Sequence, residues 1–296
     1  MNNNQLTKIL LTGANGQLGR ELRLLLDSDR RFEVVYTDVA ELDITSREAV
    51  DRFVAECRPH YIVNCAAYTA VDRAEDDEAA ATLLNTQAVA ILARAAASCG
   101  ARMVHVSTDY VFDGQACRPY REDAPTRPTS VYGRTKLGGE LALLTTLPGQ
   151  AVVLRTAWLY SPHGSNFVKT MLKLGRERNE LRVVYDQVGN PTSATDLARA
   201  IVTVLTAPQW KPGIYHYADE GAVSWYDFTK AIHRLAGITG CNVQPCLSSD
   251  YPTRATRPHY SVLDKAKFKA AFHTTIPHWE ESLKACLQQI LNQQPH

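Results

Sequence analysis

The stretch "LLTGANGQLGREL" (residues 10–22) carries the strongest fold signal in this 296-residue chain. Its glycines, Gly13, Gly16 and Gly19, follow a short apolar run and open a helix-like segment. In a strand–turn–helix unit the first glycine permits a tight turn, the second lets the backbone approach a pyrophosphate, and the third lets the helix pack close to the strand. The helix N-terminus favours the negative charge. The pattern predicts a dinucleotide-binding turn.

Short apolar runs alternate with helix-like stretches through the first half of the chain. The expected strands cover residues 8–13, 33–38, 61–67, 102–109 and 151–160, and the expected helices cover 16–29, 46–58, 76–99 and 131–146. Such β-branched runs are typical of strands buried on both faces of a parallel sheet. The alternation therefore predicts an α/β fold with a doubly wound, Rossmann-type parallel sheet.

The alternation of strand-like and helix-like stretches becomes less regular after about residue 160. We expect residues 1–155 to form the dinucleotide-binding domain and residues 156–296 to form mainly a smaller α/β substrate-binding lobe, interleaved with the first. The helix expected at 193–207 should pack back on the first domain. Further expected elements are helices at 166–179, 224–237 and from about 278, strands at 181–187 and 213–219, and a loop at 245–260.

Composition and charge exclude several classes of protein. The net charge is +1, so no basic surface points to nucleic acid or to a membrane. No uninterrupted apolar run reaches the roughly 20 residues that span a bilayer, and the start, "MNNNQLTK", lacks the pattern of a signal peptide. The chain has seven cysteines, an odd number, and no CxxC motif. This favours reduced thiols in a cytoplasmic protein over disulfides or a zinc site.

Residues at the ends of the second and third expected strands suit an adenosine site. Asp38 ends the second strand, where a carboxylate accepts hydrogen bonds from ribose and repels a 2′-phosphate. It therefore favours NADH, although the nearby Arg20 would soften that repulsion. Asp43 and Ile44 are placed to flank an adenine, and the small Ala66 and Ala67 would let a cofactor lie against backbone.

A proton-transfer set follows. "HVSTDYVFDG" (105–114) ends the fourth expected strand and brings Thr108 and Asp109 to the edge of the sheet that holds the glycine turn. Tyr132 and Lys136 in "TSVYGRTKLGGE" (129–140) lie four apart, on one face of the next helix. A nearby cation favours phenolate over phenol. The set predicts carbonyl reduction, with Tyr132 as the proton donor and Thr108 bonded to the carbonyl oxygen.

These motifs resemble the extended short-chain dehydrogenase/reductase superfamily and, within it, the dTDP-4-dehydrorhamnose reductase family. The similar segments are spread over nearly the whole chain: "TGANGQLG" (12–19), "TAVDRAE" (69–75), "STDYVFDG" (107–114), "VYGRTKLGGE" (131–140), "RTAWLY" (155–160), "NFVKTML" (166–172), "DQVGNPTSA" (186–194) and "RPHYS" (257–261). One departure is Gly138–Gly139, where an Ala-Gly pair is usual in the family.

The resemblance implies NAD(P)H-dependent reduction of the 4-keto group of dTDP-4-dehydro-β-L-rhamnose, the last step in making dTDP-L-rhamnose for cell-surface polysaccharide such as O-antigen. It implies Tyr132, Lys136 and Thr108 as catalytic residues. For the cofactor it implies Gly16, Gln17, Leu18, Asp38, Asp43, Ile44, Ala66, Ala67 and Tyr68. For the sugar nucleotide it implies Val71, Asp72, Asp109, Trp158, Asn166 and Arg257.

Alternatives remain open at this stage. Another nucleotide-sugar reductase or epimerase of the superfamily would share these motifs, and so would a non-catalytic NAD(P)-binding regulatory subunit. Asp109 without an adjacent Glu disfavours a dehydratase. Trp158 would also suit a core position, and Arg257 a solvated one. A small-molecule nucleotide sugar is the expected partner. The sequence leaves open whether the protein forms a homodimer and whether a Mg²⁺ ion assists it.

Overall fold

The computed structural model describes residues 6–292 and contains a six-stranded sheet with the order β10-β5-β4-β3-β1-β2. All five strand pairs are parallel, with Thr12 opposite both Thr37 and Asn64 and with Thr108 opposite Thr156. The strands are β1 (Thr7–Thr12), β2 (Phe32–Thr37), β3 (Tyr61–Asn64), β4 (Arg102–Thr108), β5 (Ala151–Thr156) and β10 (Gly213–His216). The carboxyl ends of β1, β3 and β4 therefore meet at one edge.

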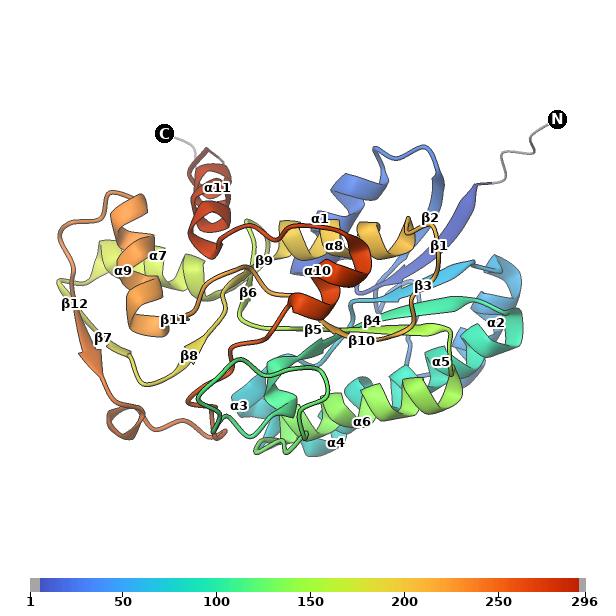
Figure 1. The fold of residues 1–296 in the computed structure, drawn as a ribbon, viewed down its shortest axis with the longest axis horizontal. Helices are drawn as coiled ribbons and strands as arrows, with labels where there is room; N and C mark the ends of the chain where they lie inside the picture. The colour runs from blue at the N-terminus through green and yellow to red at the C-terminus, as the bar shows by residue number, and fades with distance from the viewer. Residues whose placement is uncertain (1–5, 293–296) are drawn as a thin grey trace.

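Helices cover both faces of this sheet (Figure 1). Leu22 of α1 and Ile201 of α8 pack with Ile9 on one face, whereas Val89 of α5 and Leu143 of α6 belong to the apolar cluster on the other. The covering helices are α1 (Gln17–Leu26), α8 (Ala194–Leu205) and α10 (Ala266–Phe272) on the first face and α2 (Arg47–Cys57), α5 (Ala88–Cys99) and α6 (Val131–Thr146) on the second. This arrangement confirms the predicted doubly wound α/β fold.

The helix expected at 76–99 contains a π-helical segment. It consists of α4 (Glu78–Thr82), the π segment η1 (Leu83–Gln87) and α5. By length and composition alone, the helical stretch Glu78–Cys99 is apolar enough to cross a membrane, and half of its most apolar window is buried. Its buried side chains pack with those of α2 and α6, as in the core helix of a globular domain.

A third apolar cluster forms a smaller lobe beyond the sheet, at the left of Figure 1. Its helices are α7 (Phe167–Glu177), α9 (Trp225–Leu235) and α11 (Trp279–Asn292). Three two-stranded pairs accompany them: β6 (Leu159–Tyr160) with β9 (Thr192–Ser193), β7 (Glu180–Val184) with β12 (Asn242–Cys246), and β8 (Val188–Gly189) with β11 (Val223–Ser224). Short helices η2 (Asp109–Val111), α3 (Val71–Ala74) and η3 (Ser248–Asp250) lie in the loops.

Several predicted boundaries were wrong. The strand expected at 151–160 is interrupted at Trp158, whose φ of 47° bends the chain between β5 and β6. Strand β12 begins before the expected loop at 245–260 and extends into it, and α10 was not predicted at all. Both elements are short and depend on partners distant in sequence, since β12 pairs with β7 and Phe268 of α10 packs against Tyr215 and Tyr217.

All seven cysteines lie within residues 6–292 and form no disulfide there. In the same range no group of three or more His, Cys, Asp or Glu side chains is placed to hold a metal ion. The first five residues of the segment assessed for a signal peptide lie outside the described part of the chain.

Candidate active site

The glycine turn between β1 and α1 has the geometry of a diphosphate cradle. Gly13 has a φ of +70°, and a Cβ atom built on it would lie 2.6 Å from the Ala66 backbone nitrogen. A Cβ atom on Gly19 would overlap the Gly13 carbonyl oxygen. Only glycine fits either position, and the turn leads directly into the N-terminus of α1. Such a turn suits the diphosphate of a dinucleotide, because backbone N–H groups and the helix dipole both favour an anion.

This turn opens into a cavity of about 1000 Å³ that runs along the carboxyl edge of the sheet. All but one of the residues predicted from the sequence line it, although they come from segments up to 244 residues apart. These are Gly13, Gly16, Gln17, Leu18, Gly19, Asp38, Asp43, Ile44, Ala66, Ala67, Tyr68, Val71, Thr108, Asp109, Tyr132, Lys136, Trp158, Asn166 and Arg257. The exception is Asp72. The cavity is the candidate active site, and the ligand contacts of its residues stay predictions.

The end of the cavity that is predicted to hold adenosine has a carboxylate fixed by backbone donors. Asp38 accepts hydrogen bonds from the backbone nitrogens of Asn15 (3.0 Å) and Val39 (2.9 Å). Asp43 uses one oxygen to accept from the backbone and hydroxyl of Thr45, and this hydroxyl in particular lowers the pKa of the Asp43 carboxyl. Asp38 is therefore held rigidly at the end of β2, whereas Asp43 also stabilises the turn that precedes α2.

Tyr132 lies in the first turn of α6, beside Thr108. Burial raises the pKa of the Tyr132 phenol, an effect that the Thr108 hydroxyl partly opposes. Desolvation disfavours the charged form of a tyrosine, so burial opposes the phenolate that a neighbouring cation would favour. Burial also raises the pKa of Asp109 to about 6. A phenol that stays protonated suits a proton donor better than a base.

Lys136 is 2% exposed and lies one turn beyond Tyr132 on α6. Its Nζ donates a hydrogen bond to the Val106 carbonyl oxygen (2.6 Å) and lies 3.5 Å from His105 Nε2. Burial lowers the pKa of Lys136 to about 8. Its ammonium group therefore loses a proton much more readily than that of a lysine in water.

The side chain of Asp72 points to the 254–257 loop instead of lining the cavity. It accepts hydrogen bonds from Arg257 Nη2 (2.6 Å) and from the Ala255 backbone nitrogen (3.1 Å). Arg257 also donates to the Tyr110 hydroxyl (3.2 Å). Asp72 and Tyr110 thus orient the guanidinium group of Arg257 at the rim of the cavity.

Trp158 forms an aromatic wall with a residue that the sequence did not reveal. Its ring stacks on Trp225 with the centroids 3.4 Å apart and the planes at 7°, and both rings line the cavity. Trp225 is the first residue of α9, and its position is typical of an ordinary amphipathic helix. No local signal marks it, because its partner lies 67 residues earlier.

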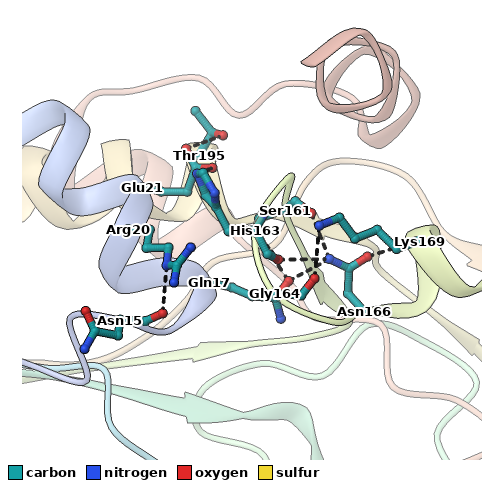
Figure 2. Close-up of polar contacts among 10 residues, drawn as sticks. All are labelled: Asn15, Gln17, Arg20, Glu21, Ser161, His163, Gly164, Asn166, Lys169 and Thr195. Carbon is teal, nitrogen blue, oxygen red and sulfur yellow. Dashed lines mark hydrogen bonds and ion pairs between the residues drawn. The ribbon is translucent and has the colours of Figure 1, made fainter. Parts of the chain in front are cut away.

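Figure 2 shows how the glycine turn is tied to the smaller lobe. The Gln17 side-chain oxygen accepts hydrogen bonds from Asn166 Nδ2 (2.8 Å) and from the Ser161 hydroxyl (3.3 Å). Asn166 Nδ2 also donates to the Ser161 carbonyl oxygen, and Asn166 Oδ1 caps α7 by accepting from the Lys169 backbone nitrogen. The amide of Asn166, predicted to meet the sugar nucleotide, therefore bridges the two lobes.

A second contact between α1 and its neighbours lies nearby (Figure 2). Glu21 is buried, accepts a hydrogen bond from the Thr195 hydroxyl of α8 (2.9 Å) and lies 3.5 Å from His163 Nε2. These contacts hold α1, α8 and the loop before α7 together behind the glycine turn.

Comparison with known proteins points to one family. Residues 7–292 match the family model of the RmlD substrate binding domain. A dTDP-4-dehydrorhamnose reductase from Aggregatibacter actinomycetemcomitans is 41% identical over 288 residues, covering 94% of this chain and 98% of that protein. A crystal structure of a dTDP-4-dehydrorhamnose reductase from Clostridium acetobutylicum is 45% identical with a TM-score of 0.92, covering 96% and 99% of the two chains.

A third relative adds a cofactor complex. The dTDP-4-dehydrorhamnose reductase from Bacillus anthracis was crystallised with NADP and is 36% identical, with a TM-score of 0.92 and coverage of 96% and 100%. The similarity spans both lobes, as the sequence motifs predicted. The chain therefore belongs to the dTDP-4-dehydrorhamnose reductase family.

Proposed function

We propose that this protein reduces the 4-keto group of dTDP-4-dehydro-β-L-rhamnose to give dTDP-L-rhamnose, using a nicotinamide cofactor. One observation carries the proposal: the glycine turn and the Thr108, Tyr132 and Lys136 set line the same cavity. The family relatives support the choice of substrate. The reaction is expected in the cytoplasm, as part of the supply of activated rhamnose for cell-surface polysaccharide.

The residues of the cavity divide the work of carbonyl reduction. Gly13, Gly16 and Gly19 would hold a reduced nicotinamide cofactor, which would supply the hydride for the carbonyl carbon. Tyr132 holds a proton on its phenol oxygen and gives it to the carbonyl oxygen, which gains charge. Thr108 offers a hydroxyl to that same oxygen. Lys136, buried on the same helix face, holds the proton that can restore the phenol.

Trp158, Trp225 and Arg257 would receive the sugar nucleotide. The stacked indoles present an apolar wall to a sugar ring. Arg257, oriented by Asp72 and Tyr110, can bind a diphosphate through two parallel N–H bonds. Both features line the same cavity as the glycine turn.

Asp38 favours NADH over NADPH in this proposal. Its carboxylate is fixed at the end of β2 and would accept hydrogen bonds from ribose hydroxyls while repelling a 2′-phosphate. Arg20 reduces the contrast, since its side chain is held at the same turn by the Asn15 carbonyl oxygen (3.0 Å).

The test is cofactor oxidation followed at 340 nm, with the dTDP-4-keto sugar generated in situ and NADH or NADPH in parallel. Loss of absorbance together with formation of dTDP-L-rhamnose supports the proposal. Cofactor binding without oxidation would favour the regulatory-subunit alternative. Oxidation that yields a different 6-deoxyhexose would favour another nucleotide-sugar reductase of the superfamily.

A further inference from the structure

A chain of buried polar side chains runs beneath the cavity to Lys136. Thr12, Asn64, His105 and Lys136 are each no more than 2% exposed. The Thr12 hydroxyl donates to Asn64 Oδ1 (2.7 Å), Asn64 Nδ2 contacts His105 Nδ1 (3.1 Å), and His105 Nε2 lies 3.5 Å from Lys136 Nζ. No sequence motif predicted Thr12, Asn64 or His105 as a site residue.

The orientation of the Asn64 amide is fixed by backbone. The Ala66 N–H, which can only donate, bonds to Asn64 Oδ1 at 3.1 Å. Turning the amide over would place two donors against each other, because Nδ2 would then face that N–H. Asn64 Nδ2 must therefore point to His105 Nδ1 and donate to it.

This bond determines which nitrogen of His105 carries the proton. A neutral imidazole has one N–H group and one acceptor nitrogen. Burial, together with the charge of Lys136, lowers the pKa of His105 well below its usual range, so the ring is neutral. Since Nδ1 accepts from Asn64, the proton is on Nε2, and the Nε2–H group faces Lys136.

Burial outweighs the groups around Lys136 that favour its ammonium form, which are the Val106 carbonyl oxygen at 2.6 Å from Nζ and the charge of Glu140. Glu140, one turn further on α6, forms a buried ion pair with Arg155 of β5 (2.7 Å) and also accepts from Ser107. Burial raises the pKa of the Cys65 thiol to about 12, so Cys65 presents no charge near neutral pH. The Tyr132 phenol is neutral as well. An N–H group aimed at Nζ opposes the ammonium and can donate to the lone pair of the amine.

We propose that His105 is a positioning residue that favours the amine form of Lys136, so that this lysine readily returns a proton to the catalytic tyrosine. The inference rests on the proposed function. After Tyr132 gives its proton to the substrate oxygen, an N–H bond of the Lys136 ammonium breaks and the O–H bond of Tyr132 forms again. The resulting amine accepts the Nε2–H of His105 and is protonated by solvent before the next turnover.

The first test reads the tautomer and needs no substrate. In ¹⁵N-histidine-labelled protein, the wild-type His105 ring should carry its proton on Nε2. In Asn64→Asp, a carboxylate oxygen would face Nδ1, so the proton should move to Nδ1. A wild-type ring protonated on Nδ1 would overturn the proposal.

The second test follows the protonation of Lys136 by NMR of lysine side chains labelled with ¹³C at Cε, assigned with Lys136→Met. His105→Phe removes the N–H that opposes the ammonium, so the Lys136 titration should move up by about one pH unit. The matched control is His216→Phe, since His216 is a second fully buried histidine of the same sheet whose ring contacts the Tyr120 carbonyl oxygen instead of Lys136. An unchanged titration in His105→Phe, or an equal shift in the control, would refute the role.

The third test measures enzyme kinetics with the proposed substrate. His105→Phe should lower kcat roughly tenfold near neutral pH, leave KM close to wild type and move the alkaline limb of the kcat profile upward. His216→Phe should leave that limb in place. If wild-type protein does not turn over the substrate, the proposed function fails while the two NMR tests still decide the role of His105.

Discussion

At the scale of single residues, the proposed chemistry depends on Tyr132. Burial raises the pKa of its phenol and so keeps the proton in place for donation. Tyr132→Phe removes the hydroxyl and little else, so kcat should fall by about 10²–10⁴-fold. Cofactor binding, measured by fluorescence titration, should stay close to wild type. Unchanged turnover would remove Tyr132 from its assigned role as the acid.

At the same scale, Asp38 is proposed to favour NADH over NADPH. Asp38→Ala removes the carboxylate that would face a 2′-phosphate, so the ratio of kcat/KM for NADPH to that for NADH should rise about tenfold, which corresponds to about 1.4 kcal/mol of relieved charge repulsion. Asp51→Ala is the control, because Asp51 is an exposed acid on α2 outside the cavity. A similar ratio in wild type and Asp38→Ala would show that the ribose contact is misassigned.

At the scale of elements, the π segment η1 and α6 pack unusually closely. Asn85 of η1 accepts from the Tyr68 backbone nitrogen and donates to the Tyr68 carbonyl oxygen and the Thr135 hydroxyl. It thereby ties the cavity loop after β3 to the helix that carries Tyr132. The glycine pair of α6 permits this approach, since a Cβ atom on Gly139 would overlap the Asn85 carbonyl oxygen. The pair therefore has a packing role that its low helix propensity conceals.

Gly139→Ala should destabilise the protein by about 1–3 kcal/mol, because the added methyl group pushes against backbone. Gly138→Ala is the matched control: its Cβ atom would lie 2.8 Å from Thr86 Oγ1, a side-chain atom, whereas that of Gly139 would overlap backbone, so the loss should be smaller. Urea unfolding at fixed pH measures both. Equal stability of wild type and Gly139→Ala would contradict the close-packing argument.

At the scale of the whole molecule, the two halves of the chain are interleaved. Strand β10 of the second half pairs with β5, and Leu197 and Ile201 of α8 pack in the cluster that covers one face of the sheet. The division at residue 155 stays a prediction. The glycine turn and the smaller lobe are joined through Gln17 and Asn166, so the cavity depends on both halves.

Stability at low pH should reflect a histidine of this sheet. Burial lowers the pKa of His216 from 6.5 to about 3, so between these values the unfolded chain binds a proton that the folded chain does not. Its stabilising contribution is present above pH 6.5 and is lost as pH falls toward 3. As the pH falls across this window, the unfolding free energy of wild type should decrease relative to that of His216→Phe by about 1.4 kcal/mol per pH unit. A difference independent of pH would contradict the lowered pKa.

The sequence by itself determined the features that depend on residues close together in the chain. Apolar runs and helical periods predicted the strands and helices of the sheet, and Gly13 marked the turn because no other residue adopts its backbone without a clash. The Tyr132 and Lys136 spacing marked one helix face. These patterns can be recognised in the sequence because each depends on residues only a few positions apart.

Only the tertiary structure decided how distant residues meet. It paired Asp72 with Arg257, stacked Trp158 on Trp225, and placed His105 between Asn64 and Lys136. Burial in the folded chain raises the pKa of Tyr132, and the four-residue spacing from Lys136 does not indicate this burial. Burial, tautomers and ion pairs follow from the packing of the entire chain, so no local pattern can report them.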